Sequence, residues 1–167
     1  RKKSDVLKDL KEKVRYTEII DADVNYYQKE LSKIWNRLEE EQRNADTEFL
    51  KHASYNRAIQ SERQAAGIAK LPSVIEFVKN IMEIEESVVV FCHHKTIHKL
   101  LHESLQEFSP SSIIGGQTDN DRQKSIDSFQ DGDTKLMIAG LRAGNLGINL
   151  TRARYVLFAE LDWSPAI

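Results

Sequence analysis

From Pro72 onward, short apolar segments alternate with amphipathic segments of helical periodicity, and this alternation limits the possible fold more than any other feature. The apolar segments have the length and composition of buried strands: Ser87–Phe91, Ser112–Ile114, Leu136–Ala139 and Tyr155–Ala159. Strands that alternate with helices through short connections form a parallel sheet with helices on both faces. The pattern therefore predicts an α/β fold.

Residues 1–70 are more polar and have the periodicity of long helices. Apolar residues recur there at spacings of three and four: Val24, Tyr27, Leu31, Ile34 and Leu38. Asp21 or Asp23 is expected to cap this helix, and a second helix is expected over residues 45–69. The stripe spans only about two heptads, so we expect it to pack on the neighbouring domain, with a coiled coil as the alternative. We divide the chain into residues 1–70 and 71–167.

Composition narrows the range of functions. The net charge is −2, so any contact with nucleic acid must come from a local cationic patch. The single cysteine, Cys92, excludes an internal disulfide, and we expect a buried core thiol in a reducing compartment. No apolar run approaches the roughly 20 residues of a membrane span. Because the chain opens on Arg1 without a Met, we expect an excised fragment.

Ligands of open parallel sheets bind at the carboxyl ends of the strands, so function is expected in the loops that follow them. Residues 141–151 form such a loop, in which Gly144 and Gly147 let the backbone approach another molecule closely. Residues 118–121, Thr-Asp-Asn-Asp, have the pattern of a helix start. Thr118 is therefore expected at a helix N-terminus, where phosphate binds well.

Two of these loops resemble motifs of Swi/Snf-family helicase-like DNA translocases. Val88–Lys95, Val-Val-Val-Phe-Cys-His-His-Lys, resembles helicase motif IV, and its His-His-Lys ending resembles the annealing-helicase (HARP-like) branch. Ile114–Thr118 with Arg122 resembles the next motif, commonly Ile-Asp-Gly-Ser-Thr followed by Arg. Gly115 replaces the usual Asp.

Three further segments resemble the same family. Arg142–Leu150 resembles motif V, although Leu141 takes the position of a Thr and Asn145 that of a second Gly. Phe158–Pro165 resembles the segment before motif VI. Arg1–Lys13 resembles the segment that leaves the first motor lobe. The resemblance implies a RecA-like second lobe in residues 71–167, preceded by a helical interlobe segment.

The resemblance implies a role as the second motor lobe of an ATP-dependent, DNA-stimulated translocase or helicase-like remodeller. ATP and Mg²⁺ would bind between this lobe and a first RecA-like lobe of the same chain, because no Gly-x-x-x-x-Gly-Lys-Ser/Thr loop occurs here. Motif VI arginines, which assist hydrolysis, are expected beyond Ile167. No catalytic residue is therefore assigned, and the fragment alone is expected to be inactive. An intracellular location is implied: the nucleus in a eukaryote, or the cytoplasm or nucleoid in a bacterium or phage-infected cell.

The resemblance also implies two sets of binding residues. The nucleotide-binding set is Gly144, Gly147 and Asn149. The DNA-binding set is Lys95, Gly116, Thr118, Arg122 and Arg142. These groups suit backbone phosphates and read no bases, so DNA binding is expected to be independent of sequence and sensitive to salt. Arg122 has an alternative role, which is to lock its loop to a nearby carboxylate.

Other polar residues near these loops are interpreted as structural. Glu160 and Asp162 project to the same side of an extended segment, which favours loop anchoring or an interlobe role over acid–base catalysis. His94 and His98 are four residues apart but have no suitably spaced further ligand, so no metal site is assigned. Trp163 is expected to be a packing anchor, with base stacking as the alternative.

A second function remains open from the sequence. The departures at Gly115 and Leu141 also fit a non-catalytic, helicase-like lobe that docks protein or DNA. Its long N-terminal helices would then be the interaction surface. A phosphate loop upstream and motif VI downstream in the parent chain would favour the motor.

Overall fold

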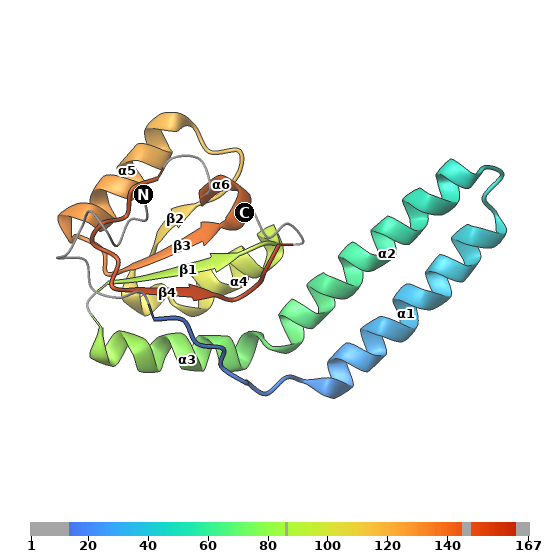
Figure 1. The fold of residues 1–167 in the computed structure, drawn as a ribbon, viewed down its shortest axis with the longest axis horizontal. Coiled ribbons are helices and arrows are strands. Elements are labelled where there is room, and N and C mark those ends of the chain that lie inside the picture. Colours follow the sequence, from blue (N-terminus) through green and yellow to red (C-terminus); the bar gives the residue numbers. More distant parts are fainter. Residues whose placement is uncertain (1–13, 86, 145–147, 163–167) are drawn as a thin grey trace, which may run out of the picture.

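The computed structural model describes residues 14–85, 87–144 and 148–162 (Figure 1). A helical hairpin extends from an α/β domain, and the two parts are joined through the end of helix α2. The helices are α1 (Val24–Arg43), α2 (Glu48–Ala69), α3 (Leu71–Ile84), α4 (Lys95–Ser104), α5 (Asp119–Asp131) and α6 (Leu141–Gly144), with a 3-10 turn at Gln106–Phe108. The strands are β1 (Val88–Cys92), β2 (Ser111–Ile113), β3 (Leu136–Gly140) and β4 (Tyr155–Phe158).

The hairpin consists of α1 and α2, which lie side by side. Asp23 caps α1 by accepting a hydrogen bond from Tyr26 N at 2.9 Å, which confirms one of the two predicted caps. The expectation that the α1 stripe packs on the neighbouring domain is wrong, because α1 packs chiefly on α2. The Tyr27 hydroxyl, for example, donates to Glu62 at 2.9 Å. The short connection between the helices turns α2 back along α1, so the stripe meets its partner within the hairpin.

The four strands form one parallel sheet in the order β2-β3-β1-β4, as the alternation predicted. Val88 of β1 pairs with Leu136 of β3 and with Tyr155 of β4, so β1 lies in the interior of the sheet. This position explains its continuous apolar sequence, because both of its faces are buried. In β2 the strand begins at Ser111, one residue before the expected start.

Helices cover both faces of the sheet, as predicted. On one face, α3 and α4 pack over alternate residues of β1 and β3, including Val88, Val90 and Ile138. On the other face, Phe129 of α5 packs on Val89 and its neighbours. Both faces of the sheet are therefore apolar. The polar side chains of the connections lie at the ends of the strands. None of the helices in the described ranges has the length and apolar character to cross a bilayer.

Three connections meet at the carboxyl edge of the sheet. Helix α4 begins at Lys95, shortly after β1, and α5 begins after its cap, Thr118, which accepts from Asp121 N at 3.2 Å. Helix α6 follows β3 directly, where a loop was expected from residue 141 onward. Gly116 has a φ of +100°, a left-handed conformation that favours glycine and that turns the chain from β2 toward α5.

Candidate nucleic-acid interface

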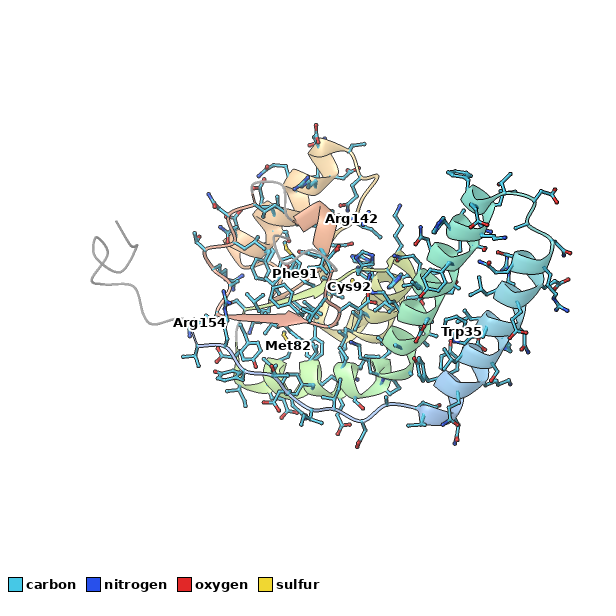
Figure 2. All side chains as sticks on the ribbon, turned by 45° about the vertical axis from the view of Figure 1, so that its right-hand side comes forward. Trp35, Met82, Phe91, Cys92, Arg142 and Arg154 are labelled. Atoms are coloured by element: carbon cyan, nitrogen blue, oxygen red, sulfur yellow. The ribbon has the colours of Figure 1, made fainter. Side chains whose placement is uncertain are left out.

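A pocket of about 270 Å³ lies at this carboxyl edge. Its lining comes from the connections after β1, β2 and β3: His93, His94, Lys95, His98, Ile114, Gly115, Gly140, Arg142 and Ala143. Figure 2 shows Arg142 at this edge and Arg154 at the start of β4, toward the other end of the strands. The pocket therefore lies where parallel sheets usually bind ligands.

The β1–α4 turn, which we define as His93–Lys95, is fixed by one buried carboxylate. Glu160 Oε2 accepts the backbone N–H of His93 at 2.8 Å and of His94 at 2.9 Å, and Glu160 Oε1 lies 2.6 Å from His94 Nδ1. The Glu160 residue is only 6% exposed. This geometry confirms the loop-anchoring interpretation for Glu160, because its oxygens are occupied by the turn.

Asp162 lies beside the same turn and reaches the cationic residues. Its side chain is only 5% exposed, and Oδ2 lies 3.1 Å from His93 Nδ1 and 3.7 Å from Arg142 Nε. The Arg142 side chain is 75% exposed despite this contact, so it also faces solvent. The ion pair with Asp162 therefore leaves the Arg142 side chain open to solvent.

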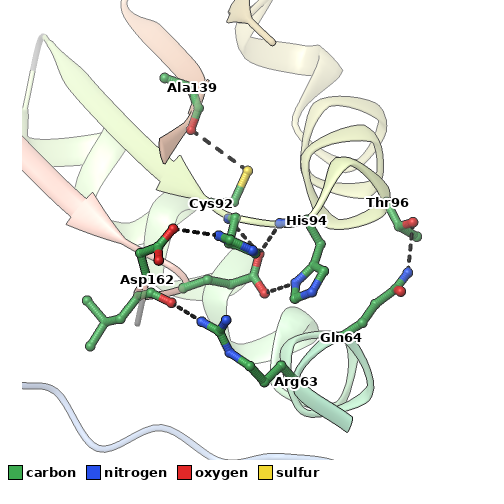
Figure 3. Close-up of polar contacts among 10 residues, drawn as sticks. Arg63, Gln64, Cys92, His94, Thr96, Ala139 and Asp162 are labelled. Carbon is green, nitrogen blue, oxygen red and sulfur yellow. Dashed lines mark hydrogen bonds and ion pairs between the residues drawn. The ribbon is translucent and has the colours of Figure 1, made fainter. Parts of the chain in front are cut away.

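Helix α2 contributes residues that the sequence reasoning missed. Arg63 donates to the carbonyl oxygen of Leu161, and Gln64 Nε2 donates to Thr96 Oγ1 at 2.8 Å (Figure 3). Gly67 lies directly against Glu160 and Ile97. A glycine inside a helix commonly marks a close approach, so Gly67 was the signal available in the sequence.

The structure brings together two of the predicted DNA-binding residues, Lys95 and Arg142, which both line the pocket. Thr118 and Gly116 lie on the neighbouring connection after β2 and are exposed. Arg122 Nη2 donates to the Ala143 carbonyl oxygen at 2.8 Å, so it ties α5 to α6. That contact is with a backbone carbonyl, whereas the sequence offered a carboxylate as the locking partner.

Of the predicted nucleotide-binding residues, Asn149 does not line this pocket, whereas Gly144 directly follows Ala143, which does. Gly144 ends α6, and Asn149 is exposed, with its backbone oxygen accepting from Gln130 Nε2 at 3.2 Å. Gly147 lies outside the described residues, as does Trp163. The described part of the chain therefore places Asn149 beside α5 and the cationic residues at the end of β1 and β3.

Burial alters the acid–base behaviour of three residues at this edge. Burial lowers the pKa of His93, and the neighbouring His94 lowers it further. Burial also lowers the pKa of His98, whose Nε2 lies 3.1 Å from the Ile138 carbonyl oxygen. Burial, followed by the charge of Glu160, raises the pKa of the Cys92 thiol to about 12. Cys92 is fully buried and free, which confirms the prediction of a core thiol.

A parallel sheet ordered β2-β3-β1-β4 with helices on both faces is a RecA-like fold. Residues 69–167 match the family described as "Helicase conserved C-terminal domain". The chain belongs to this family, and its relatives include SWI/SNF-related proteins. The expected RecA-like fold and the family resemblance are both confirmed.

Known proteins resemble this chain over different lengths. The Drosophila melanogaster SWI/SNF-related matrix-associated actin-dependent regulator of chromatin subfamily A-like protein 1 is 30% identical over 172 residues, covering 99% of this chain and 22% of that protein. The mouse DNA annealing helicase and endonuclease ZRANB3 is 32% identical over 103 residues, covering 59% of this chain and 10% of that protein. This chain therefore spans about a fifth or less of these relatives.

The solved structure of the Sulfolobus solfataricus SWI2/SNF2 ATPase C-terminal domain has the same fold. Its TM-score is 0.68 at 16% sequence identity, and the match covers 87% of this chain and 69% of that one. The coverage extends beyond residues 69–167, so the likeness includes part of the helical region that precedes them.

Proposed function

We propose that this chain is the second motor lobe of an ATP-dependent, DNA-stimulated translocase. In this proposal the carboxyl edge of the sheet grips the DNA backbone, and the lobe forms one side of an ATP site completed by a first RecA-like lobe. The observation that carries the proposal is that two cationic residues, Lys95 and Arg142, line the same pocket on a lobe of the helicase family. A translocase of this kind would act in the nucleus of a eukaryote or on the DNA of a bacterium or phage-infected cell.

Among the described residues, the edge offers groups that suit phosphate. Lys95 is exposed at the start of α4, and the exposed Arg142 guanidinium is steadied by Asp162. The N-terminus of α5, with Gly116 and Thr118 before it, adds the backbone N–H groups that the Thr118 cap leaves open, although its first turn also carries the carboxylates of Asp119 and Asp121. Contacts of this type fix the position of the duplex without depending on its sequence.

Arg122 has a supporting role in this proposal. Its bond to the Ala143 carbonyl oxygen joins the connection after β2 to the connection after β3. A shift of one connection would therefore move the other, and the phosphate-binding groups would move as a unit. Arg122 is assigned to DNA binding on this basis, as a residue that holds the phosphate-binding connections together.

The ATP side of the lobe is assigned to Gly144, Gly147 and Asn149. Asn149 is exposed, as expected for a residue whose ATP site is completed by the surface of the first lobe. ATP with Mg²⁺ would supply the phosphoryl chemistry between the two lobes. This chain has no phosphate loop of its own, so we expect no ATP turnover from the isolated 167-residue chain.

Duplex DNA binding, measured by fluorescence anisotropy against salt concentration, tests the proposal. The logarithm of the binding constant falls with the logarithm of salt by about 0.9 for each phosphate contact. Lys95→Ala and Arg142→Ala should each lower the slope by roughly that amount. Lys135→Ala is the matched control, because Lys135 is exposed and precedes β3 at the amino end of the strands. Equal slopes for all four proteins would contradict the proposal.

A non-catalytic docking module is the second candidate. The observation that favours it is the exposure of Phe49 and Leu50 near the start of α2, where the hairpin turns. Under this alternative, the natural protein would fold and bind a partner through the hairpin but would hydrolyse no ATP with any DNA.

A further inference from the structure

We propose that Glu160 is a positioning residue for the DNA-facing β1–α4 turn, and that it transmits the placement of helix α2 to Lys95. This inference rests on the proposed function, because Lys95 is one of the residues assigned there to DNA. Glu160 itself is buried and lies outside the set of exposed residues assigned to DNA.

Glu160 determines where the turn lies. Its Oε2 atom accepts hydrogen bonds from the backbone N–H groups of His93 and His94, the two residues immediately before Lys95. A carboxylate oxygen that accepts two backbone N–H groups fixes the peptide planes on both sides of a residue. The orientation of the first turn of α4, and with it the Lys95 side chain, follows from that constraint.

The second oxygen of Glu160 also sets the tautomer of His94. A carboxylate oxygen can only accept, so the 2.6 Å contact requires a proton on His94 Nδ1. His94 Nε2 is buried and has no hydrogen-bond partner within the described residues. A tautomer with its proton on Nδ1 therefore satisfies this contact, whereas the Nε2–H tautomer would place a donor where the described residues hold no acceptor.

Helix α2 packs closely against the same carboxylate. A Cβ atom on Gly67 would lie 2.9 Å from Glu160 Oε1 and 2.2 Å from Ile97 Cδ1. Gln64 donates to Thr96 in the first turn of α4, so α2 contacts both Glu160 and the residue that follows the turn. The glycine permits this close approach, and any shift of α2 along its axis would move Glu160 or collide with it.

A purely electrostatic role and a positioning role for Glu160 predict opposite changes in DNA affinity when its charge is removed. Glu160 lies beside a cationic edge, so removal of its negative charge would strengthen DNA binding if charge alone mattered. If Glu160 positions Lys95, the same change weakens binding, because Lys95 no longer meets its phosphate. The sign of the change in affinity therefore separates the two effects.

The test uses Glu160→Gln in the 167-residue chain, with duplex DNA as the probe. Loss of one phosphate contact corresponds to a salt slope about 0.9 smaller and, at 0.1 M salt, to a roughly eightfold weaker affinity. Glu103→Gln is the matched control, because this substitution removes the same charge from an exposed residue of α4. It should leave the slope unchanged. The ¹⁵N shifts of the His94 ring should show loss of the Nδ1–H tautomer only in Glu160→Gln.

A double-mutant cycle shows whether Glu160 acts through Lys95. In a Lys95→Ala background, Glu160→Gln should cause no further weakening, because the contact that it positions is already absent. Gln64→Ala removes the hydrogen bond from α2 to Thr96 without a change in the core. It should also weaken DNA binding. This variant keeps the test decisive if Glu160→Gln fails to fold.

The outcomes distinguish the two proposals. If the wild-type chain binds no DNA, the proposed function fails, and this inference fails with it in its DNA-facing form. If the wild-type chain binds DNA through Lys95, but folded Glu160→Gln and Gln64→Ala bind it with unchanged or greater affinity, the positioning role is overturned while the proposed function stands.

Discussion

Gly67→Ala should destabilise this protein, although alanine is the better helix former. In a helix interior, alanine is favoured over glycine by about 1 kcal/mol. The new Cβ would lie 2.2 Å from Ile97 Cδ1 and 2.9 Å from Glu160 Oε1, both far inside van der Waals contact. Ile97 is 1% exposed and Glu160 is held by three hydrogen-bonding contacts, so neither can withdraw freely.

Overpacking of a well-packed core costs about 1–3 kcal/mol. The upper part of that range applies here, because two restrained neighbours are displaced at once. After the gain in helix propensity is subtracted, we expect the free energy of unfolding to fall by about 1–2 kcal/mol. With a urea m-value of about 2 kcal/mol/M, the unfolding midpoint would move down by roughly 0.5–1 M.

Urea unfolding followed by circular dichroism measures this change. Ser61→Ala is the matched control, because Ser61 is an exposed residue of the same helix and its substitution changes helix propensity without a collision. It should be neutral or slightly stabilising. A Gly67→Ala midpoint equal to or above that of the wild type would refute the close approach of α2 to Glu160.

Three further predictions concern the α/β domain. Thr118→Ala should lower the free energy of unfolding by about 1 kcal/mol in thermal unfolding, because the bond to Asp121 N that caps α5 is lost; no change would argue against the cap. Burial lowers the pKa values of His93 and His98 from the ordinary 6.5, so the unfolded chain binds more protons as the pH falls below 6.5. Stability should therefore decrease from that pH downward, and urea midpoints that stay constant or rise on acidification would contradict this assignment. The Cys92 thiol, with its pKa raised to about 12, should resist alkylation at pH 8 in the folded protein and react after unfolding; rapid labelling of native protein would show that it is accessible.

The sheet was predictable because its signals are local. A run such as Ser87–Phe91 is continuously apolar only because β1 is covered on both faces, and the structure has β1 in the interior of the sheet. The cap at Thr118 likewise depends on residues within one helical turn. Strand order was not predictable in this way, because it depends on contacts between segments that are distant in sequence.

The packing partner of the α1 stripe was mispredicted for a related reason. Periodicity shows that Val24–Leu38 has an apolar face but does not show what covers it. The α1–α2 connection, which reverses the chain within a few residues, decides that α2 is the partner. Helix α6 was also missed, because four residues are too few to show helical periodicity.

The candidate site was predictable in its cationic residues and not in its supports. Lys95 and Arg142 follow strands, so the carboxyl-edge rule places them together. Glu160 was correctly expected to anchor a loop, although the sequence does not show which loop. Gly67 inside α2 marks a close approach, but the sequence does not show that its partner is Glu160, 93 residues further along the chain.

ATP hydrolysis by the natural protein that contains this chain and the proposed first lobe, measured with and without duplex DNA, tests the central claim most directly. The account predicts a rate that rises on addition of DNA. It also predicts that Arg142→Ala lowers the DNA-stimulated rate, whereas Lys135→Ala, at the amino end of the strands, leaves it unchanged. Absence of ATP hydrolysis from folded protein under every DNA condition would contradict the motor-lobe assignment and favour the docking module.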